Sequence, residues 1–333
     1  MSVVADHPQF DHRTALGEVV PIDVWRIVRL TAMGIYVVVM LWWFRTQGMV
    51  WERISVAVAL GIFLACAFIG KPLREWRRLA FDVAFYCVMW YGYETTRGAA
   101  DGRVLGIKFP LQIESVRNID RVMFFGNDPT VVLQAHFWES SVRWYDKVAS
   151  TTYMTHFFLA PIVMGALWAT NHRQFRRFLK RFATVLGVAC AMFIVMPTAP
   201  PWMAYKQYHV IGPIIRNTSR GFSSMGFKAF THGWKNSLDW GNAVAAMPSL
   251  HASFALIVPA FFLPWLRPLW LKAVVLLFPV IMLTSLVYLG EHWVIDGLVG
   301  WAIVAGSFWF WNRMEARQRR NRAQRCESAL ATL

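Results

Sequence analysis

Two histidines, His251 and His292, each stand at the edge of a long apolar run of the sequence. His251 lies in Met-Pro-Ser-Leu-His-Ala-Ser, and His292 lies in Gly-Glu-His-Trp-Val-Ile-Asp. A polar group at the margin of hydrocarbon is costly unless it has partners, so the repeated setting indicates a built site. Asp296 follows His292 by four residues, and on a helix the two side chains would share one face. We therefore expect Asp296 to fix the imidazole tautomer of His292.

A histidine nucleophile with a second histidine as general acid suits phosphoryl transfer, because one imidazole attacks phosphorus and the other protonates the leaving oxygen. The phosphoryl oxygens then need donors nearby. Ser249 and the amides after Pro248 are candidates at a helix N-terminus. Cations of the loop that precedes them are further candidates: Lys206, Arg216 and Arg220. Two alternatives stay open. The two histidines and the aspartate could form a network that only packs helices, or a zinc site, although their local contexts match no zinc motif.

The composition is that of a membrane protein. Of 333 residues, 56% are apolar and only 16% are charged, against about a quarter charged in a globular domain. The net charge of +15 could indicate nucleic acid, but the basic residues lie between the apolar runs. We expect no nucleic-acid partner, and the four cysteines show no metal-type spacing and predict no disulfide framework.

Eight apolar windows are each long enough to cross a bilayer as a helix, which needs about 20 residues. The predicted fold is all-α and polytopic, with about eight transmembrane helices. The expected spans are 27–44, 54–70, 79–95, 148–170, 182–199, 248–266, 273–289 and 292–312.

Three short basic blocks, Lys71–Arg78, Arg173–Arg181 and Arg313–Arg325, alternate with these spans and are typical of cytoplasmic loops and tails. The sequence shows no cleavable signal peptide, and both termini are expected in the cytoplasm. His251 and His292 then fall at the outer ends of their helices. We expect an integral plasma (inner) membrane protein whose active site faces the extracytoplasmic side.

The chain divides into three parts on this interpretation. Residues 1–78 hold a cytoplasmic tail and two additional helices, residues 79–312 form a six-helix catalytic core, and residues 313–333 are a basic cytoplasmic tail. Within the core, 96–146 is too polar to span and is expected to lie on the outer surface as short amphipathic helices. Residues 203–246 are expected to form an outer loop that carries all three candidate cations.

The motifs resemble a known family. Met-Pro-Ser-Leu-His-Ala (247–252) and Gly-Glu-His-Trp-Val-Ile-Asp-Gly (290–297) are similar to the second and third signature motifs of the type 2 phosphatidic acid phosphatase superfamily. Pro197–Trp202 and Asn242-Ala243-Val244-Ala245-Ala246 resemble more narrowly its branch of inositol phosphorylceramide synthases and their bacterial relatives. The resemblance covers roughly 115–312. It implies a six-helix phosphatase or phosphotransferase core and a substrate-binding position for Asn242.

The resemblance assigns roles residue by residue. His292 would be the nucleophile that forms a phosphohistidine, Asp296 its orienting partner, and His251 the general acid and later the base. Two departures separate the chain from ordinary phosphatases of the family. Ser285-Leu286 stands where their third motif has Ser-Arg, and Pro197–Trp202 replaces their first motif, Lys-x6-Arg-Pro. Both departures are similar to the headgroup-transferase branch.

The sequence thus predicts a membrane enzyme that moves a phospho-headgroup, with phosphoinositol as one candidate, onto a lipid alcohol. The alternatives are a lipid phosphate or polyprenyl pyrophosphate phosphatase and a non-catalytic lipid transporter or scaffold. The expected partner is a phospholipid or polyprenyl phosphate substrate. No cofactor or metal is implied, since the histidines and basic residues supply the electrophilic help. Donor, acceptor and oligomeric state are not predicted, and the roles of His156, Asp82 and Asp120 stay open.

Overall fold

The computed structural model describes residues 24–47, 53–99, 109–225 and 244–331 of the 333-residue chain. This part is helical, with two isolated backbone bridges and no named strand, so the prediction of an all-α polytopic membrane protein is confirmed. Among the described residues, five helices are long and apolar enough to cross a membrane, and two shorter helices are also apolar. The chain packs as two compact units that divide after Leu79.

The first unit is a pair of helices, α1 (Val24–Gln47) and α2 (Arg53–Phe68). Tyr36 of α1 donates a hydrogen bond to the carbonyl oxygen of Ala59 in α2 at 2.9 Å. Most of the large apolar side chains of α1 are exposed, as expected for a helix that faces lipid. A third helix, α3 (Leu73–Ala99), runs across the division between the units.

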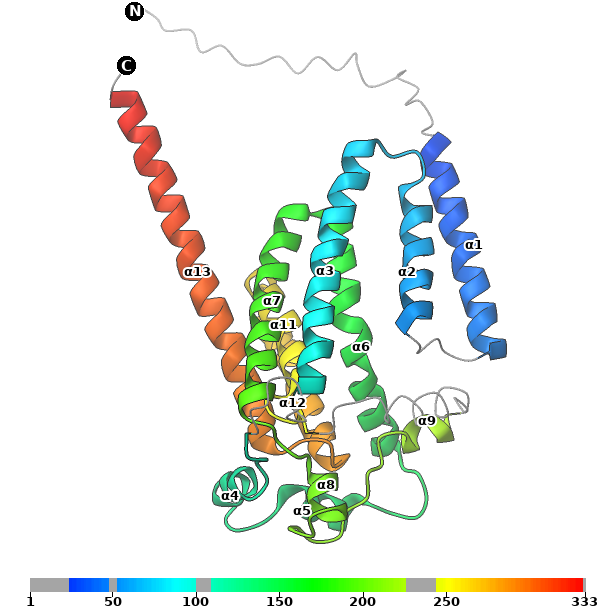
Figure 1. Ribbon diagram of the computed structural model, residues 1–333, viewed down its shortest axis with the longest axis vertical. Coiled ribbons are helices and arrows are strands. Elements are labelled where there is room, and N and C mark those ends of the chain that lie inside the picture. The colour runs from blue at the N-terminus through cyan, green and yellow to red at the C-terminus, as the bar shows by residue number, and fades with distance from the viewer. Residues whose placement is uncertain (1–23, 48–52, 100–108, 226–243, 332–333) are drawn as a thin grey trace, which may run out of the picture. The chain divides into compact units, whose positions relative to one another are not determined.

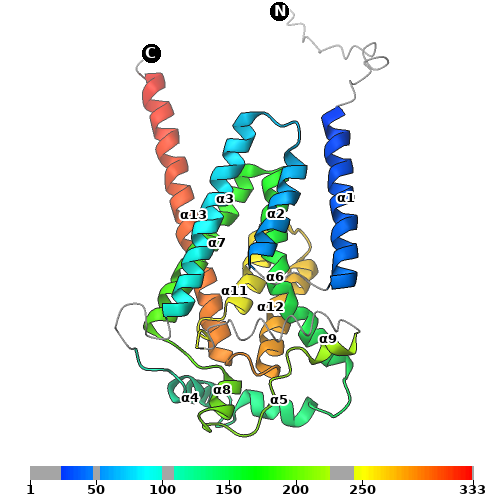
Figure 2. The same ribbon diagram turned by 45° about the vertical axis from the view of Figure 1, so that its right-hand side comes forward.

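The second unit is a helical bundle with short helices at one end (Figures 1 and 2). The long members are α6 (Trp144–Thr170), α7 (His172–Val195), α11 (Leu250–Phe262) with the 3₁₀ turn Leu263–Trp265, α12 (Leu269–Tyr288) and α13 (Val294–Ala331). The short helices are α4 (Glu114–Met123), α5 (Pro129–Phe137), α8 (Pro201–Lys206) and α9 (Arg220–Ser224). Helix α4 contacts α13 and α5 contacts α12, so these short helices cover the end at which α13 begins.

Polar caps explain where the long helices start. The Asp146 carboxylate accepts a hydrogen bond from Arg143 N at 2.8 Å at the start of α6, and Asn171 Oδ1 accepts one from Gln174 N at 3.1 Å at the start of α7. Ser249 has the same role at the start of α11. Each cap satisfies an amide that the helix itself leaves without a partner.

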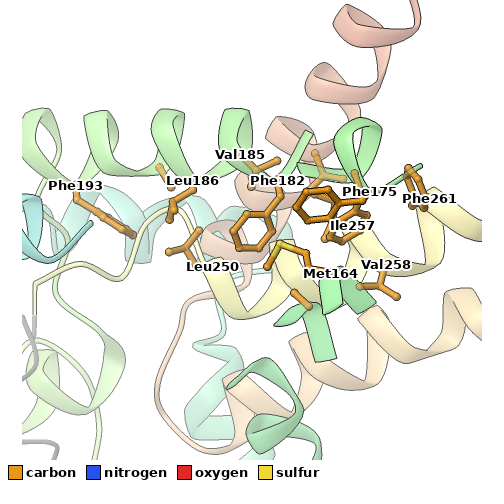
Figure 3. Close-up of a cluster of buried hydrophobic side chains, with 14 residues drawn as sticks. Met164, Phe175, Phe182, Val185, Leu186, Phe193, Leu250, Ile257, Val258 and Phe261 are labelled. Atoms are coloured by element: carbon orange, nitrogen blue, oxygen red, sulfur yellow. The ribbon is translucent and has the colours of Figure 1, made fainter. Parts of the chain in front are cut away.

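The core of the second unit lies between α6, α7, α11 and α13 (Figure 3). The buried residues of α7 recur every three or four positions, which turns one stripe of the helix inwards. Apolar side chains also cover the outside of the bundle, where lipid replaces water. The cluster contains Ala160, Met164, Phe175, Phe178, Phe182, Val185, Leu186, Ala189, Phe193, Leu250, Ile257, Val258, Phe261 and Val304.

All three basic blocks expected outside the helices are helical, and the first of them opens α3 from Leu73 onwards. Arg173–Arg181 lies inside α7, and Arg313–Arg325 continues α13 without a break. Arginine and lysine are good helix formers, so a helix need not end where the apolar run ends. Arg181 is buried, and its Nη1 lies 3.0 Å from Glu315 Oε1, which ties the far part of α13 to α7.

Some predicted segments lie outside the described residues. These are the tail up to residue 23 and residues 226–243 of the outer loop, which include Asn242. The described part of segment 96–146 holds α4 and α5.

Candidate active site

His292 lies just before α13, and its ring is held by Asp296. Nδ1 of His292 is 3.3 Å from Oδ2 of Asp296, and the same oxygen accepts a hydrogen bond from Trp293 N at 2.9 Å. We expected His292 and Asp296 to share one face of a helix, but α13 begins at Val294, so His292 precedes the helix. Asp296 lies in the first turn of α13 and its carboxylate points back to His292. A carboxylate there satisfies free amides and the positive helix end. With Nδ1 directed at Asp296, Nε2 is the ring nitrogen that can attack phosphorus.

A glycine turn brings His292 to this position. Helix α12 ends at Tyr288, and Gly290 then adopts φ +78°, a left-handed conformation that other residues rarely take. Glu291 N donates to Leu286 O at 3.0 Å and satisfies a carbonyl at the end of α12. The glycine of the third motif is therefore required by the turn that precedes the histidine.

The start of α11 is bound directly to the start of α13. Ser249 is the N-cap of α11: its Oγ accepts from Ala252 N at 3.3 Å, and its own N donates to Asp296 O at 2.9 Å. A Cβ added to Gly300 would lie 2.5 Å from Ser253 Oγ and 2.7 Å from Ser249 O, so α13 approaches α11 as closely as a glycine permits. The hydroxyl hydrogen of Ser249 is the group that this buried residue can offer to a phosphate.

His251 projects from the first turn of α11 towards His292, and the two ring centroids are 5.6 Å apart. The ring of His251 stacks on His156 of α6 at 3.9 Å and lies 4.4 Å from the ring of Tyr153. Nε2 of His251 is buried, and it has no hydrogen-bond partner among the residues that the structure describes. Such an atom is costly to leave unpaired, so we expect a substrate oxygen to pair with it.

Asp120 of α4 caps the start of α13 from a distant part of the sequence. Its Oδ2 accepts a hydrogen bond from Val294 N at 2.8 Å, and its Oδ1 accepts one from Ile295 N at 2.9 Å. The side chain is buried, and burial raises the pKa of Asp120 to about 6 despite the two amide bonds. Together with Asp296, this carboxylate occupies the amides of Trp293, Val294 and Ile295.

The segment Pro197–Trp202 makes backbone contacts next to both histidine motifs. It forms isolated parallel bridges with Gln112 on one side and with Ala245 on the other. Trp293, next to the proposed nucleophile, is buried and donates its indole N–H to Ala199 O at 2.7 Å. The prolines end α7 and open α8, so this stretch supplies backbone contacts close to the site.

Arg216 is held beside the third motif by Glu291. Its Nε and Nη2 donate to the two carboxylate oxygens at 2.7 and 2.9 Å, and Thr218 donates its hydroxyl to the same carboxylate. The guanidinium carbon lies 4.4 Å from the ring centre of Trp202. Burial is the largest single effect and disfavours the cation, but the charge of Glu291 and the hydrogen bonds to it together raise the pKa of Arg216. Nη1 of Arg216 takes no part in this pair, whose carboxylate belongs to the residue directly before His292.

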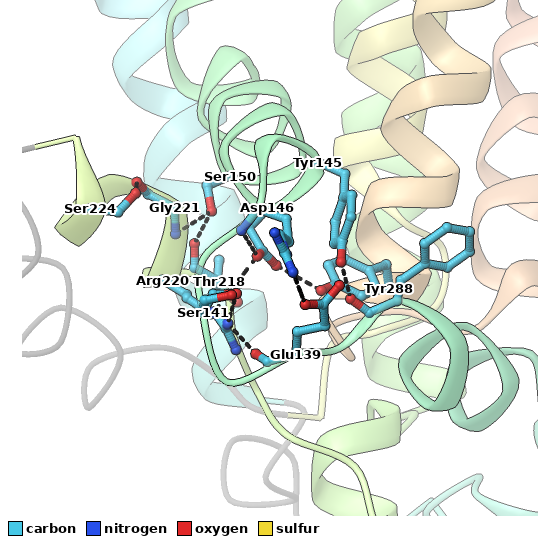
Figure 4. A network of polar contacts seen from close by, with 12 residues as sticks. Glu139, Ser141, Tyr145, Asp146, Ser150, Thr218, Arg220, Gly221, Ser224 and Tyr288 are labelled. Atoms are coloured by element: carbon cyan, nitrogen blue, oxygen red, sulfur yellow. Dashed lines mark hydrogen bonds and ion pairs between the residues drawn. The ribbon is translucent and has the colours of Figure 1, made fainter.

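Arg220 has different surroundings, although it lies four residues further on (Figure 4). Its Nη2 donates to the backbone oxygens of Glu139 and Ser141, and its Nε is 3.7 Å from Asp146 Oδ2. The other oxygen of Asp146 accepts a hydrogen bond from Tyr288 OH at 2.6 Å. Arg220 thus connects the loop to the start of α6 and, through Asp146, to the end of α12.

Two residues predicted to bind substrate, Lys206 and Asn242, are not part of this arrangement as the structure describes it. Lys206 is exposed at the end of α8, and Asn242 belongs to the undescribed part of the loop. The described residues contain no group of three or more His, Cys, Asp or Glu side chains that could hold a metal ion.

Comparison with protein families matches residues 115–310 to the PAP2 superfamily. The match covers more than half of the chain and includes His251, His292 and Asp296. The chain belongs to the PAP2 superfamily. No curated protein and no solved structure matches it. Membership makes the chain a membrane enzyme of the lipid phosphatase and phosphotransferase type.

Within the PAP2 superfamily, the chain differs at the position of the motif arginine. Leu286 stands there, and it is fully buried near the end of α12. A leucine has no hydrogen-bond donor in its side chain. Arg216 is the described cation whose partner, Glu291, is the residue directly before His292.

Two further residues shape this PAP2 site and were not predicted. Gln134 of α5 is buried, donates to Ile215 O and Tyr288 O at 2.8 Å each, and accepts from Ile215 N at 2.8 Å. It has no local sequence signal, because its partners are far away in the chain. Glu291 does have a signal, since an acidic residue that adjoins an apolar run needs a cation to neutralise it when it is buried.

Proposed function

We propose that the chain is a lipid phosphotransferase in which His292, His251 and Asp296 form the catalytic centre. The observation that carries the proposal is the approach of the two imidazoles, 5.6 Å between ring centroids, with Asp296 on Nδ1 of one of them. Two imidazoles this close together could contact one phosphoryl group, one as the attacking nitrogen and the other as the proton donor. Membership of the PAP2 superfamily supports a lipid phosphate substrate.

The reaction has two steps. Nε2 of His292 attacks phosphorus, the bond from phosphorus to the leaving oxygen breaks, and protonated His251 gives its proton to that oxygen. The Asp296 carboxylate stabilises the positive charge that develops on the imidazole. In the second step, His251 takes the proton of an acceptor hydroxyl, whose oxygen attacks the phosphohistidine and restores His292. Arg216 Nη1 and the Ser249 hydroxyl would bind the phosphoryl oxygens.

Transfer to an alcohol is favoured over transfer to water by two features. The buried Leu286 replaces the arginine of the phosphatase motif, and the Pro197–Trp202 segment stands in place of the first phosphatase motif. Both are similar to the headgroup-transferase branch. We therefore propose a lipid alcohol as acceptor and a phospho-headgroup, such as phosphoinositol, as the group transferred.

The side of the membrane follows from charge. The arginines from Arg313 to Arg325 extend α13 at the end opposite to His292 (Figure 1). Cytoplasmic segments collect such residues, so we propose that the histidines face the extracytoplasmic side of the plasma membrane and that both termini are cytoplasmic. Cys326 is exposed in this basic stretch. A membrane-impermeant maleimide applied to intact cells should leave Cys326 unlabelled, and labelling would reverse the orientation.

The decisive experiment incubates the purified protein with extracted host lipids and follows lipids and inorganic phosphate by mass spectrometry. His292→Ala should abolish turnover. His136→Ala is the matched control, because His136 is exposed on α5 and bonds to its own helix at Val132 O. EDTA should leave turnover unchanged, since no metal is needed in these steps.

Each product pattern gives a different conclusion. A new phospho-headgroup lipid that requires His292 would establish the transferase and name both substrates. Release of inorganic phosphate from a lipid phosphate or polyprenyl pyrophosphate, without a new lipid, would make the protein a phosphatase. Equal turnover or equal lipid movement with His292→Ala would reject the catalytic role and leave a transporter or scaffold.

A further inference from the structure

We propose that Asp120 is a positioning residue for the transfer reaction, holding the first turn of α13 so that His292 stands in line with the phosphorus. The proposal rests on the proposed function, because it needs His292 as nucleophile. Neither histidine motif contains Asp120, which lies in α4 and meets α13 across a large sequence separation.

The first step of the argument is the geometry of the cap. A helix start leaves amides without partners, and most helices satisfy them with a residue directly before the helix. In α13 a carboxylate from another element does this, with one oxygen on Val294 N and the other on Ile295 N. His292 lies two residues before Val294, so its backbone position depends on this anchor.

The second step concerns how firmly the anchor is held. Arg117, three residues before Asp120 in α4, forms a two-pronged ion pair with Asp128 ahead of α5, at 2.7 and 2.6 Å. On the same helix, Val116 is fully buried in a cluster that includes Trp293. Helix α4 is therefore fixed on both sides, and Asp120 presents its carboxylate to α13 from a rigid support.

The third step is electrostatic. Asp120 and Asp296 are both buried at the start of α13, and the negative charge of Asp296 adds to the burial that raises the pKa of Asp120. The nearby Asp128 acts in the same direction, although Arg117 neutralises much of its charge. The site keeps two carboxylates behind the nucleophile, where they favour the cationic imidazole of the phosphohistidine step.

The test compares Asp120→Asn with the unmutated enzyme in the lipid assay. A carboxamide has one oxygen, so its NH₂ group would face the second amide, donor against donor. We expect kcat to fall about 10-fold for Asp120→Asn and about 100-fold for Asp120→Ala, with KM changed less than threefold, because a misplacement of about 1 Å can cost that much. Glu114→Gln is the matched control, since Glu114 is an exposed acid in the first turn of the same helix.

A pH series separates positioning from mere stability. Protonated Asp120 resembles a carboxamide, so the ratio of kcat between unmutated enzyme and Asp120→Asn should shrink towards one as the pH falls through about 6. As the pH falls, the unmutated enzyme should lose its advantage in kcat over Asp120→Asn but gain in unfolding free energy relative to that variant. Because the folded-state pKa is raised above 3.8, the folded state binds the extra proton, and the unmutated protein gains stability relative to the variant between pH 7 and 4.

The outcomes distinguish this proposal from the proposed function. If His292→Ala abolishes turnover and Asp120→Asn keeps kcat within twofold per folded enzyme, the positioning role is wrong and the function stands. If His292→Ala retains turnover, the proposed function itself is wrong. Should Asp120→Asn fold poorly, Asp120→Glu keeps the charge but displaces it by one methylene, and unchanged kcat in that variant would overturn the proposal.

Discussion

Arg216 and Arg220 lie four residues apart in one loop, and the sequence predicts the same phosphate-binding role for both. The structure gives them different partners. Arg216 pairs with Glu291, the neighbour of His292, whereas Arg220 contacts Asp146 and backbone oxygens around the start of α6. These contacts are why the phosphate-binding proposal is kept for Arg216 alone, since a place in the same basic loop does not distinguish the two arginines.

The comparison predicts the largest loss for Arg216→Ala. Removing the guanidinium takes away the proposed hydrogen-bond donor to the phosphoryl oxygens. It also leaves the buried Glu291 carboxylate without its cation. We expect kcat/KM in the lipid assay to fall about 100-fold, the usual range for losing one transition-state donor. Arg267→Ala, at an exposed arginine between the 3₁₀ turn and α12, is the control for general loss of charge. Full activity in Arg216→Ala would remove Arg216 from the site.

Glu291→Gln should have a smaller effect, about 10-fold on kcat/KM, because Arg216 keeps its charge but loses its two-pronged orientation. The double variant Arg216→Ala/Glu291→Gln should be no worse than Arg216→Ala alone, since both changes act on one unit. Additive losses in this double-mutant cycle would show that Glu291 acts independently of Arg216.

Arg220→Ala should lower the unfolding free energy of the protein but leave kcat almost unchanged. Asp146 is buried and would lose a cation, but the pair is long at 3.7 Å, so we expect a cost of about 1–2 kcal/mol in unfolding free energy. Thermal unfolding in detergent measures this cost, and kcat per folded enzyme should stay within about threefold of the unmutated value. An unchanged midpoint with a 100-fold loss of kcat would place Arg220 with Arg216.

Lys206→Ala should have the smallest effect of the series. Its side chain is exposed at the end of α8, where solvent screens its charge. We expect kcat/KM and the thermal midpoint to stay within about twofold and 1 °C of the unmutated protein. A marked rise in KM would mean that substrate reaches Lys206 before it reaches the histidines.

The sequence predicted the helical membrane fold well because apolar runs of the right length have few other solutions in lipid. It placed the starts of α3 and α7 too late and the end of α13 too early, because these helices include most of Lys71–Arg78, Arg173–Arg181 and Arg313–Arg325. Hydropathy reports where a helix leaves the hydrocarbon, but the helix itself ends only where backbone hydrogen bonding ends.

The approach of His251 to His292 was predictable, because both stand at the same expected membrane depth and in recognisable motifs. The roles of Asp120 and Gln134 were not. Their partners are 174 and 154 positions away, and no local pattern in the sequence assigns a role to either side chain. Buried polar pairs of this kind are fixed by tertiary packing, which leaves no local pattern in the chain.

Gly300 shows how little variation the contact between the two histidine-bearing helices can accept. A Cβ at that position would overlap Ser253 Oγ and the carbonyl oxygen of Ser249. Every single-base change of a glycine codon that alters the residue introduces at least a Cβ. This codon therefore has no harmless missense neighbour, and a genetic screen for loss of function should recover substitutions here as readily as at the histidines themselves.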